Sequence, residues 1–297
     1  MLFERGLLVA RLGALQVFKR KQHTLASSVP VSHKVKEILS QGNIFADFTL
    51  LANKHGAMNL GQGFPSFGSP SFLSSTLNEV AQGDIFQADG SAPENLHNQY
   101  TKPGGDPLFS EILCQDYSSR FKRDLKPENI CTTVGAQEAI FTALSTFTNP
   151  GDEIVVITPA FDSYFKSASV CGLEVKSCPM VCDADQPTAA GQYRLDSKML
   201  RSILSENTRM LLFNTPSSPF GKVFCRSELE SIANVVKDFP NLILLADEVY
   251  EHMVYDGKAH EHIANIDSMW EKTITVFSVG KTGKTHSEPP REAGCTP

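Results

Sequence analysis

Long apolar runs are absent from the sequence, and so is any excess of positive charge. No apolar stretch approaches the roughly 20 residues that a membrane-spanning helix needs, so we predict no membrane segment. The 297 residues carry 27 lysines and arginines against 33 aspartates and glutamates, which gives a formal net charge of −6. Nucleic-acid binding depends on basic side chains that neutralise phosphates, so we also predict no broad nucleic-acid binding.

The sequence has little that indicates a metal site or a disulfide framework. Its 7 cysteines include the close group Cys171, Cys178 and Cys182, but no CxxC pair and no histidine partner accompanies them. Structural zinc sites need such spacings, so we predict no metal site. Reduced thiols are the remaining interpretation, and they are typical of an intracellular compartment.

Two common catalytic motifs are missing. A GxSxG turn, which would carry the nucleophilic serine of an α/β hydrolase, does not occur. The GKTGKT stretch resembles the end of a P-loop, but that pattern requires a glycine where the sequence has Thr275 or Ser278. A phosphate loop should also precede the acidic strand, whereas this stretch follows it. Nucleotide hydrolysis is therefore disfavoured.

What the sequence does contain is an alternation of apolar runs and amphipathic stretches. With 41% hydrophobic and 20% charged residues it has the composition of a globular protein. Its length suits one large α/β domain or two smaller ones. Strands that alternate with helices are typical of a doubly wound, mostly parallel sheet, and this is the α/β fold class that we predict. The expected strands are Ile130–Val134, Glu153–Ile157, Leu173–Ser177, Met210–Phe213, Leu242–Ala246 and Thr273–Ser278, and the expected helices are Leu108–Lys122, Glu138–Phe147, Leu195–Leu204 and Arg226–Asp238.

Polar residues follow the last three of these strands, at the edge where ligands bind in open α/β sheets. They are Asn214 and Ser218, then Asp247 and Tyr250, then Ser278 and Lys281. A carboxylate, a phenol, a hydroxyl and an amine at converging strand ends are the groups that pyridoxal phosphate (PLP) chemistry needs. The amine forms an imine with the cofactor aldehyde, the carboxylate keeps the pyridine nitrogen protonated, and the phenol bonds the ring hydroxyl.

A second feature suits the phosphate of that cofactor. The expected strand Ile130–Val134 leads into Gly135, Ala136 and Gln137, and a helix is expected to begin at Glu138. Backbone N–H groups at a helix N-terminus bind an anion together with the helix dipole. The pattern is less specific than a P-loop, and an ordinary tight βα turn is the alternative interpretation.

Several motifs occur in an order that resembles a known family. They read MNLGQGFPSF, NQYTKPGG, TPAFDSY, NTPxxPxGKVF, DEVYxxMVYDG and SVGKT, and together they cover about Val29 to Thr282. The chain resembles the fold-type I aminotransferases, and within them the kynurenine aminotransferase / cysteine-S-conjugate β-lyase family. The resemblance implies a PLP-transferase large domain, PLP as the cofactor and a homodimer with shared active sites.

The resemblance also assigns roles to particular residues. It implies that Lys281 holds PLP as an imine and moves the proton at the substrate Cα, with Asp247 and Tyr250 as catalytic partners. Phe161 would stack on the pyridine ring, although a phenylalanine at a strand end is more often part of a core. Tyr100 would reach the phosphate bound by the partner subunit, with ordinary packing as the alternative.

The implied reaction is amino-group transfer from an L-amino acid such as kynurenine or glutamine to a 2-oxo acid. Gly63, in the glycine-rich turn Asn59–Pro65, would contact the substrate carboxylate, and an ordinary turn is the alternative. With a leaving group on the substrate Cβ, the same chemistry can eliminate that group, which is β-lyase activity.

Two departures from the family pattern qualify these expectations. Ser218 stands where the family has asparagine before the second proline of the motif, so its contact with the cofactor ring oxygen is in doubt. After Thr282 the sequence is polar and proline-rich, where the family continues with a domain that carries an arginine for the substrate carboxylate. The alternative expectation is therefore a truncated, catalytically impaired form that only binds PLP or a full-length partner.

The chain is expected to divide into four segments. Residues 1–28 are basic and almost free of acids, which indicates a mitochondrial presequence or, alternatively, an untargeted extension or a translation artefact. We expect part of a small domain at 29–75, a PLP-binding large domain at 76–282 and a disordered tail at 283–297. A mitochondrial or cytoplasmic location follows from these alternatives.

Overall fold

The computed structural model describes residues 32, 35, 36, 38, 44–61, 68, 70–83, 100–182 and 189–281. The chain divides into two compact units, Met1–Gln62 and Gly63–Pro297. No helix among the described residues has the length and apolar character needed to cross a membrane. The predicted presequence at 1–28 and the predicted tail at 283–297 lie outside the described residues, and the predicted domain boundaries stay predictions.

The described residues of the first unit include the helix α3 (Ile44–His55). An aspartate, Asp47, lies in its first turn, and Lys54 and His55 lie in its last turn. This order of charges complements the helix dipole.

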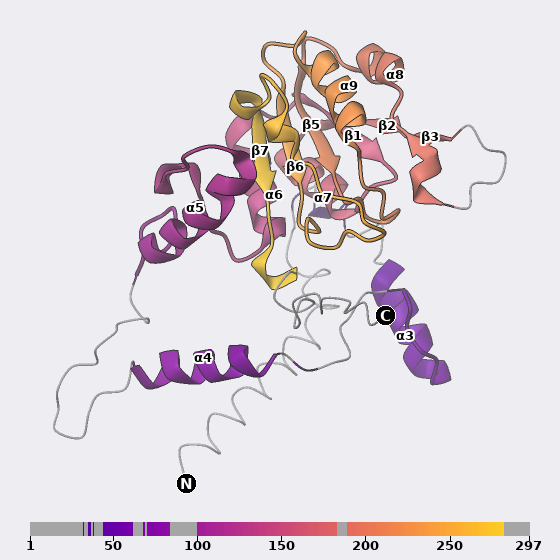
Figure 1. The fold of residues 1–297 in the computed structure, drawn as a ribbon. Helices are drawn as coiled ribbons and strands as arrows, with labels where there is room; N and C mark the ends of the chain where they lie inside the picture. Colours follow the sequence, from indigo (N-terminus) through magenta and orange to yellow (C-terminus); the bar gives the residue numbers. More distant parts are fainter. Residues whose placement is uncertain are drawn as a thin grey trace, which may run out of the picture. The chain divides into compact units, whose positions relative to one another are not determined.

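The second unit is built on a parallel sheet. In the described chain its strands lie side by side in the order β2-β1-β5-β6-β7 (Figure 1). Every neighbouring pair is parallel, which confirms the predicted mostly parallel sheet. The strands are β1 (Glu153–Thr158), β2 (Glu174–Pro179), β5 (Thr208–Asn214), β6 (Ile243–Asp247) and β7 (Thr273–Val276).

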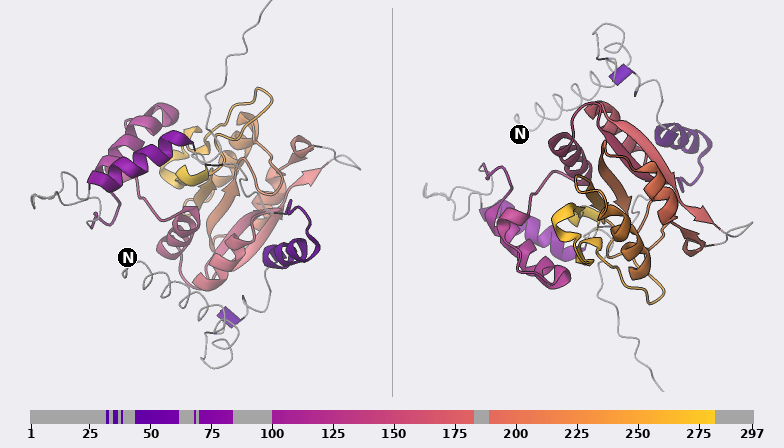
Figure 2. Two further views of the ribbon diagram at one scale, coloured as in Figure 1. Left: turned by 90° about the horizontal axis from the view of Figure 1, so that it is seen from below. Right: turned by 90° about the horizontal axis from the view of Figure 1, so that it is seen from above.

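Helices cover both faces of the sheet, as the views of Figure 2 show. The cause is visible in β5, where successive residues face opposite sides. Met210 and Leu212 pack in one buried cluster with residues of α6 (Ala136–Phe147) and α7 (Ser163–Cys171). Leu211 and Phe213 pack in the other with residues of α8 (Ser197–Ile203) and α9 (Arg226–Val236). A strand buried on both faces has to be apolar throughout, which is why its sequence is a continuous apolar run.

A third cluster lies beside β7 and involves α5 (Pro107–Phe121). The helix begins where Asp106 accepts a hydrogen bond from the backbone N–H of Phe109 at 2.8 Å, with proline in the first turn. Tyr117 and Phe121 of α5 lie against Phe277, with ring centroids 4.3 and 5.9 Å away. The predicted helix Leu108–Lys122 is confirmed to within one residue at each end.

The predicted strand Ile130–Val134 is wrong. Pro127–Asn129 forms a 3-10 turn, and the residues after it are extended but pair with no strand among those described. The backbone N–H of Thr132 bonds the carbonyl of Gly104 at 2.9 Å instead. β-branched residues favour an extended backbone, but a strand also needs a neighbouring strand to pair with. The described sheet consists of β2, β1, β5, β6 and β7, and none of them pairs with residues 130–134.

Several described elements have no counterpart among the predictions, and the helices α3 and α7 are two of them. Helix α4 (Ser71–Gly83) was not predicted, and neither was the antiparallel pair of β3 (Val181–Cys182) and β4 (Tyr193–Arg194). Short 3-10 turns also occur at Ala190–Gln192, Ile263–Asn265 and Trp270–Lys272.

Candidate active site

The ends of three neighbouring strands carry the predicted polar residues. Asn214 and Asp247 are direct partners at the last register position of β5 and β6, and Asp247 is the partner of Val276 in β7. Because the strands are parallel, these ends share one edge of the sheet, where open α/β folds bind ligands. Lys281 follows β7 by one helical turn, in which its backbone N–H bonds the carbonyl of Ser278 at 3.2 Å.

Asp247 is a buried carboxylate whose side chain is held from two directions. Its Oδ2 accepts a hydrogen bond from the hydroxyl of Tyr164 at 2.5 Å, and its Oδ1 accepts one from the backbone N–H of Val249 at 3.3 Å. Burial raises the pKa of Asp247, and the hydrogen bonds and the charge of Lys281 act in the opposite direction. A buried carboxylate of this kind is stabilised by a cationic N–H group such as a pyridinium.

Tyr164 is a site residue that the sequence analysis did not single out. It lies in the first turn of α7 and is 1% exposed. Burial, followed by the charge of Asp247, raises the pKa of its hydroxyl, so it acts as a neutral donor. The ring of Tyr164 meets that of Phe161, three residues earlier, edge-on at 5.8 Å.

The amine of Lys281 meets the phenol of Tyr250. Its Nζ donates a hydrogen bond to the Tyr250 hydroxyl at 3.3 Å and lies 5.1 Å from the ring centroid. Lys281 is exposed, and Tyr250 is half-buried against the α6–α7 side of the sheet. The structure therefore brings together the amine and the phenol that the sequence analysis placed on separate strand ends.

The side-chain amide of Asn214 makes hydrogen bonds to backbone groups at the carboxyl edge of the sheet. Its Nδ2 donates to the carbonyl of Asp247 at 2.8 Å, and its Oδ1 accepts from the backbone N–H of Ser218 at 2.5 Å. Asn214 thereby joins the ends of β5 and β6 and holds the turn that contains Ser218, which is itself half-buried. The predicted cofactor contacts of Asn214 and Ser218 stay predictions.

The anion site that the sequence predicts at the N-terminus of α6 stays a prediction. Gly135 is the N-cap residue and supplies no side-chain cap, and a Cβ at this position would meet nothing within 4 Å. Because a short turn joins α6 to β1, the helix runs against the strands and begins near their carboxyl ends. Ala136 follows the cap, and Gln137 donates to the hydroxyl of Ser167 at 2.9 Å. An open helix N-terminus, a buried carboxylate and an amine are the donor set that PLP requires, so the residues present fit this cofactor.

Three further predicted residues are less constrained. Phe161 is 40% exposed and Tyr100 is 103% exposed, so neither is part of the core. For Phe161 this contradicts the alternative that it is a core residue. Gly63 lies outside the described residues, and its predicted contact with the substrate carboxylate stays a prediction.

The fold is that of an α/β protein with a parallel sheet, and these strand ends form a candidate ligand site at its carboxyl edge. The chain belongs to the family of class I and II aminotransferases, because the family model "Aminotransferase class I and II" matches residues 56–283.

The similar proteins are named as transaminases or aminotransferases. Kynurenine–oxoglutarate transaminase 1 of Homo sapiens is 35% identical over 244 residues, which cover 81% of this chain and 55% of that protein. Kynurenine–oxoglutarate transaminase of Dictyostelium discoideum is 34% identical over 249 residues, with the same coverage. The structure of N-succinyldiaminopimelate aminotransferase from Mycobacterium tuberculosis matches with a TM-score of 0.71 and 32% identity, over 84% of this chain and 60% of that one. The chain thus spans about half the length of the curated relatives it matches.

Proposed function

We propose that the protein is a PLP-dependent aminotransferase of the kynurenine–oxoglutarate type. One observation carries the proposal within the family: a buried carboxylate at the end of β6 lies next to the strand that delivers Lys281. The relatives named as kynurenine–oxoglutarate transaminases support an amino acid such as kynurenine as donor and a 2-oxo acid as acceptor.

PLP, when bound, supplies a conjugated ring that accepts the electrons left at the substrate Cα after proton removal. Asp247 keeps a proton on the ring nitrogen, and Tyr164 keeps Asp247 in place for that contact. The backbone N–H groups at the start of α6 hold the phosphate. Phe161 packs on one face of the pyridine ring of PLP, and its side chain, in a residue that is 40% exposed, is accessible for this contact.

Lys281 anchors the cofactor and then moves the proton at the substrate Cα. An amine does this only in its neutral form, and contact with a phenol offers a partner for the proton that it releases. Tyr250 is that phenol, 3.3 Å from Nζ. Tyr250 also contacts the ring hydroxyl in this proposal.

The finer expectations belong to the same proposal. Elimination from cysteine S-conjugates would follow from the same proton removal when the substrate carries a leaving group on Cβ. A homodimer in which Tyr100 reaches the partner's phosphate site is supported by the full exposure of this tyrosine. A mitochondrial or cytoplasmic location rests on the sequence alone. The competing candidate is a chain that binds PLP, or a full-length partner, without turnover, and the doubt about Ser218 favours it.

The experiment measures PLP binding and turnover separately. The purified chain is incubated with PLP, and borohydride reduction followed by peptide mapping locates the covalent adduct. We expect the adduct on Lys281 and its loss in Lys281→Ala, while Lys258→Ala, which removes an exposed lysine of the same region, keeps it. An adduct elsewhere would refute the assignment.

Turnover is then measured with kynurenine and 2-oxoglutarate as glutamate formed. Glutamate formation that depends on Lys281 supports the aminotransferase. A Lys281 adduct without glutamate formation, tested over several amino donors, would support the competing candidate of binding without turnover.

A further inference from the structure

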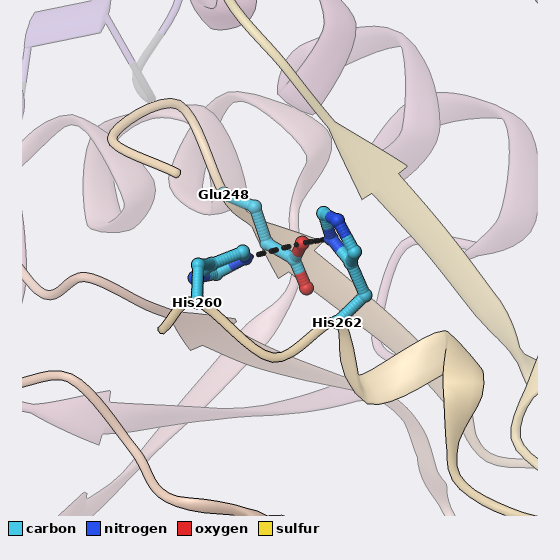
Figure 3. A group of neighbouring side chains, drawn as sticks. All are labelled: Glu248, His260 and His262. Atoms are coloured by element: carbon cyan, nitrogen blue, oxygen red, sulfur yellow. Dashed lines mark hydrogen bonds and ion pairs between the residues drawn. The ribbon is translucent and has the colours of Figure 1, made fainter. Parts of the chain in front are cut away.

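Three side chains with metal-ligand chemistry meet just beyond the end of β6, apart from the residues of the candidate active site (Figure 3). Glu248 comes from the strand end, and His260 and His262 come from the loop that follows. Their ligand atoms, one from each residue, all lie within 4.8 Å of one another. None of these side chains entered the sequence predictions, because Glu248 is separated from the HxH pair by a loop.

The three side chains are deeply buried. The side chain of Glu248 is 0% exposed and that of His260 is 7% exposed, while that of His262 is 8% exposed. Glu248 Oε2 lies 2.9 Å from His260 Nε2 and 2.5 Å from His262 Nδ1. One carboxylate oxygen therefore stands between two imidazole nitrogens that both point at it, as Figure 3 shows.

Two polar atoms of the cluster have no hydrogen-bond partner within the part of the chain that the structure describes. They are Glu248 Oε1 and His260 Nδ1. A buried carboxylate oxygen without a partner is costly, since nothing replaces the water that it loses on folding. A cation bound by both oxygens of Glu248 would satisfy Oε1, which the imidazoles do not reach.

A second layer of side chains lies behind His262. Glu251 Oε2 lies 3.7 Å from His262 Nε2, the nitrogen that faces away from Glu248. Glu251 is itself held by the hydroxyl of Tyr117 at 2.5 Å and by the guanidinium of Arg120 at 3.3 Å. A carboxylate behind a ligating histidine orients the ring and is the usual outer layer of a metal site.

The charges of the buried side chains also favour a bound cation. Glu248 and Glu251 are two buried carboxylates, with 0% and 5% side-chain exposure. Arg120 pairs with Glu251, whereas the ion-pair partners of Glu248 are histidines, which are charged only when protonated. A divalent cation would neutralise Glu248 while both imidazoles stay neutral, which is the form in which they ligate metals.

We propose that Glu248, His260 and His262 form a binding site for a divalent transition-metal ion, with Zn²⁺ as the best match. Two imidazoles and one carboxylate suit this ion, whose bonds to nitrogen and oxygen are about 2.0–2.2 Å long. Such bonds place ligand atoms somewhat farther apart than 2.5–2.9 Å, so the carboxylate withdraws slightly as the ion replaces the hydrogen-bonding protons. The site is independent of the proposed aminotransferase function.

A structural role follows from the closed surroundings. With side chains at most 8% exposed, the three residues offer no approach to a substrate. The ion would fasten the loop that carries His260 and His262 to the end of β6. There the backbone N–H of Glu248 donates a hydrogen bond to the carbonyl of Val276 in β7 at 2.9 Å. The same strand end carries Asp247.

The test uses the full chain without a polyhistidine tag, purified from zinc-supplemented medium without chelators. Elemental analysis is expected to find about one zinc per chain, and removal of the ion should lower the melting temperature until ZnCl₂ is added back. Less than about 0.1 zinc per chain, together with no change in melting temperature on adding ZnCl₂, would overturn the proposal.

Matched variants separate a metal site from a purely hydrogen-bonded cluster. His260→Gln and His262→Asn keep an N–H donor close to the position of the imidazole nitrogen that faces Glu248, but amides are poor zinc ligands. We expect both variants to lose the zinc, and His55→Asn, at an exposed histidine of α3, to keep it. Zinc retained in both cluster variants would refute the assignment.

If the variants do not fold, X-ray absorption at the zinc edge of the unaltered protein decides. Two imidazole nitrogens and carboxylate oxygen at about 2.0–2.2 Å support the site, and sulfur at about 2.3 Å would place the ion on cysteines instead. Among the described residues, Cys131 and Cys225 are the exposed candidates for such binding.

Discussion

The hydroxyl of Tyr164 donates a hydrogen bond to Oδ2 of Asp247 at 2.5 Å, across 83 residues of sequence. Both groups are buried, so the bond has no competition from water and holds the carboxylate in one orientation. In the proposed enzyme that orientation aims the carboxylate at the ring nitrogen of the cofactor. Tyr164 is therefore a positioning residue, and Asp247 is the residue that touches the cofactor.

Tyr164→Phe should weaken PLP binding without unfolding the protein. The bond from Tyr164 lowers the pKa of Asp247 against the effect of burial, so its loss raises that pKa further and disfavours the carboxylate that pairs with the ring. A hydrogen bond to a charged group contributes about 1.5–3 kcal/mol, so affinity should fall about tenfold to a hundredfold. The loss should grow as the pH is lowered, and PLP titrations at several pH values measure it. An unchanged affinity at every pH would show that Tyr164 only fills space.

Asp247→Asn should have opposite effects on stability and on turnover. Burial raises the pKa of Asp247 above its ordinary value of 3.8, so the folded state without cofactor loses stability as the pH rises through the raised pKa. The amide does not ionise, so the cofactor-free variant should unfold at a higher denaturant concentration than the unaltered protein at pH 8. The difference should vanish near pH 4.

The same variant should transaminate orders of magnitude more slowly, because an amide does not keep the ring nitrogen protonated. Denaturation curves at pH 8 and pH 4 measure the effect on stability, and single-turnover rates measure the effect on transamination. A variant that is less stable at pH 8 would contradict the stabilising effect, and a near-normal turnover rate would contradict the role at the ring nitrogen.

Asn214→Ala should destabilise the edge of the sheet that carries the candidate site. The substitution removes the bonds from the Asn214 amide to the Asp247 carbonyl and from the Ser218 N–H to Asn214. The Asp247 carbonyl keeps a bond from the N–H of Thr215 at 3.1 Å, so the main loss falls on Ser218. We expect a decrease of about 2 kcal/mol in the free energy of unfolding. Asn241→Ala, at an exposed position, is the control and should change it by less than about 0.5 kcal/mol.

Lys222→Ala should cost far more stability than the loss of a nearby surface charge. The side chain of Lys222 is 3% exposed, and its ammonium lies 2.8 Å from Glu228 and 4.8 Å from the ring centroid of Phe224. Removing one partner of a buried pair leaves the other uncompensated, although 25% exposure of Glu228 moderates the effect. We expect a loss of about 2–4 kcal/mol.

Arg226→Ala provides the comparison for Lys222→Ala, because Arg226 pairs with Glu230 at about half exposure on both sides. It should change the free energy of unfolding by about 0.5 kcal/mol or less. Urea denaturation of both variants measures the difference. Equal losses would show that burial of Lys222 has no energetic consequence.

The strands of the sheet were predictable because burial on both faces leaves a strong signal. Met210–Phe213 and Leu242–Ala246 are unbroken apolar runs. The structure extends the first run by the polar residues at its ends and shifts the second by one residue, to Ile243–Asp247. Ile130–Val134 carries a similar local signal but lacks a partner strand among the described residues, and pairing is not a local property. The 13-residue helix α4 does carry apolar residues at helical spacing, Leu73, Leu77 and Val80, so this helix could have been predicted from the sequence but was not.

The sequence predicted those residues of the candidate site that lie at or just after the ends of strands. Asp247 and Lys281 could be placed because parallel strands end at one edge. Tyr164 could not be placed, since its contact with Asp247 depends on how α7 packs on the sheet. The cluster of Glu248, His260 and His262 was missed for the same kind of reason, because the path of the loop brings the HxH pair back to the strand end.

The strand order has a consequence for how the chain assembles during synthesis. β1 and β2 pair with each other and leave one edge of β1 open, and each later strand adds to the most recent edge: β5 to β1, β6 to β5 and β7 to β6. Every strand of this sheet after β1 therefore leaves the ribosome when its partner already exists. Parallel strands with long connections pair slowly when all strands must find their partners at the same time. The order in which these strands emerge reduces the number of possible partners for each new strand. The first strand pair to emerge lies within residues 153–179, and the last strand to join this sheet is β7, which precedes Lys281.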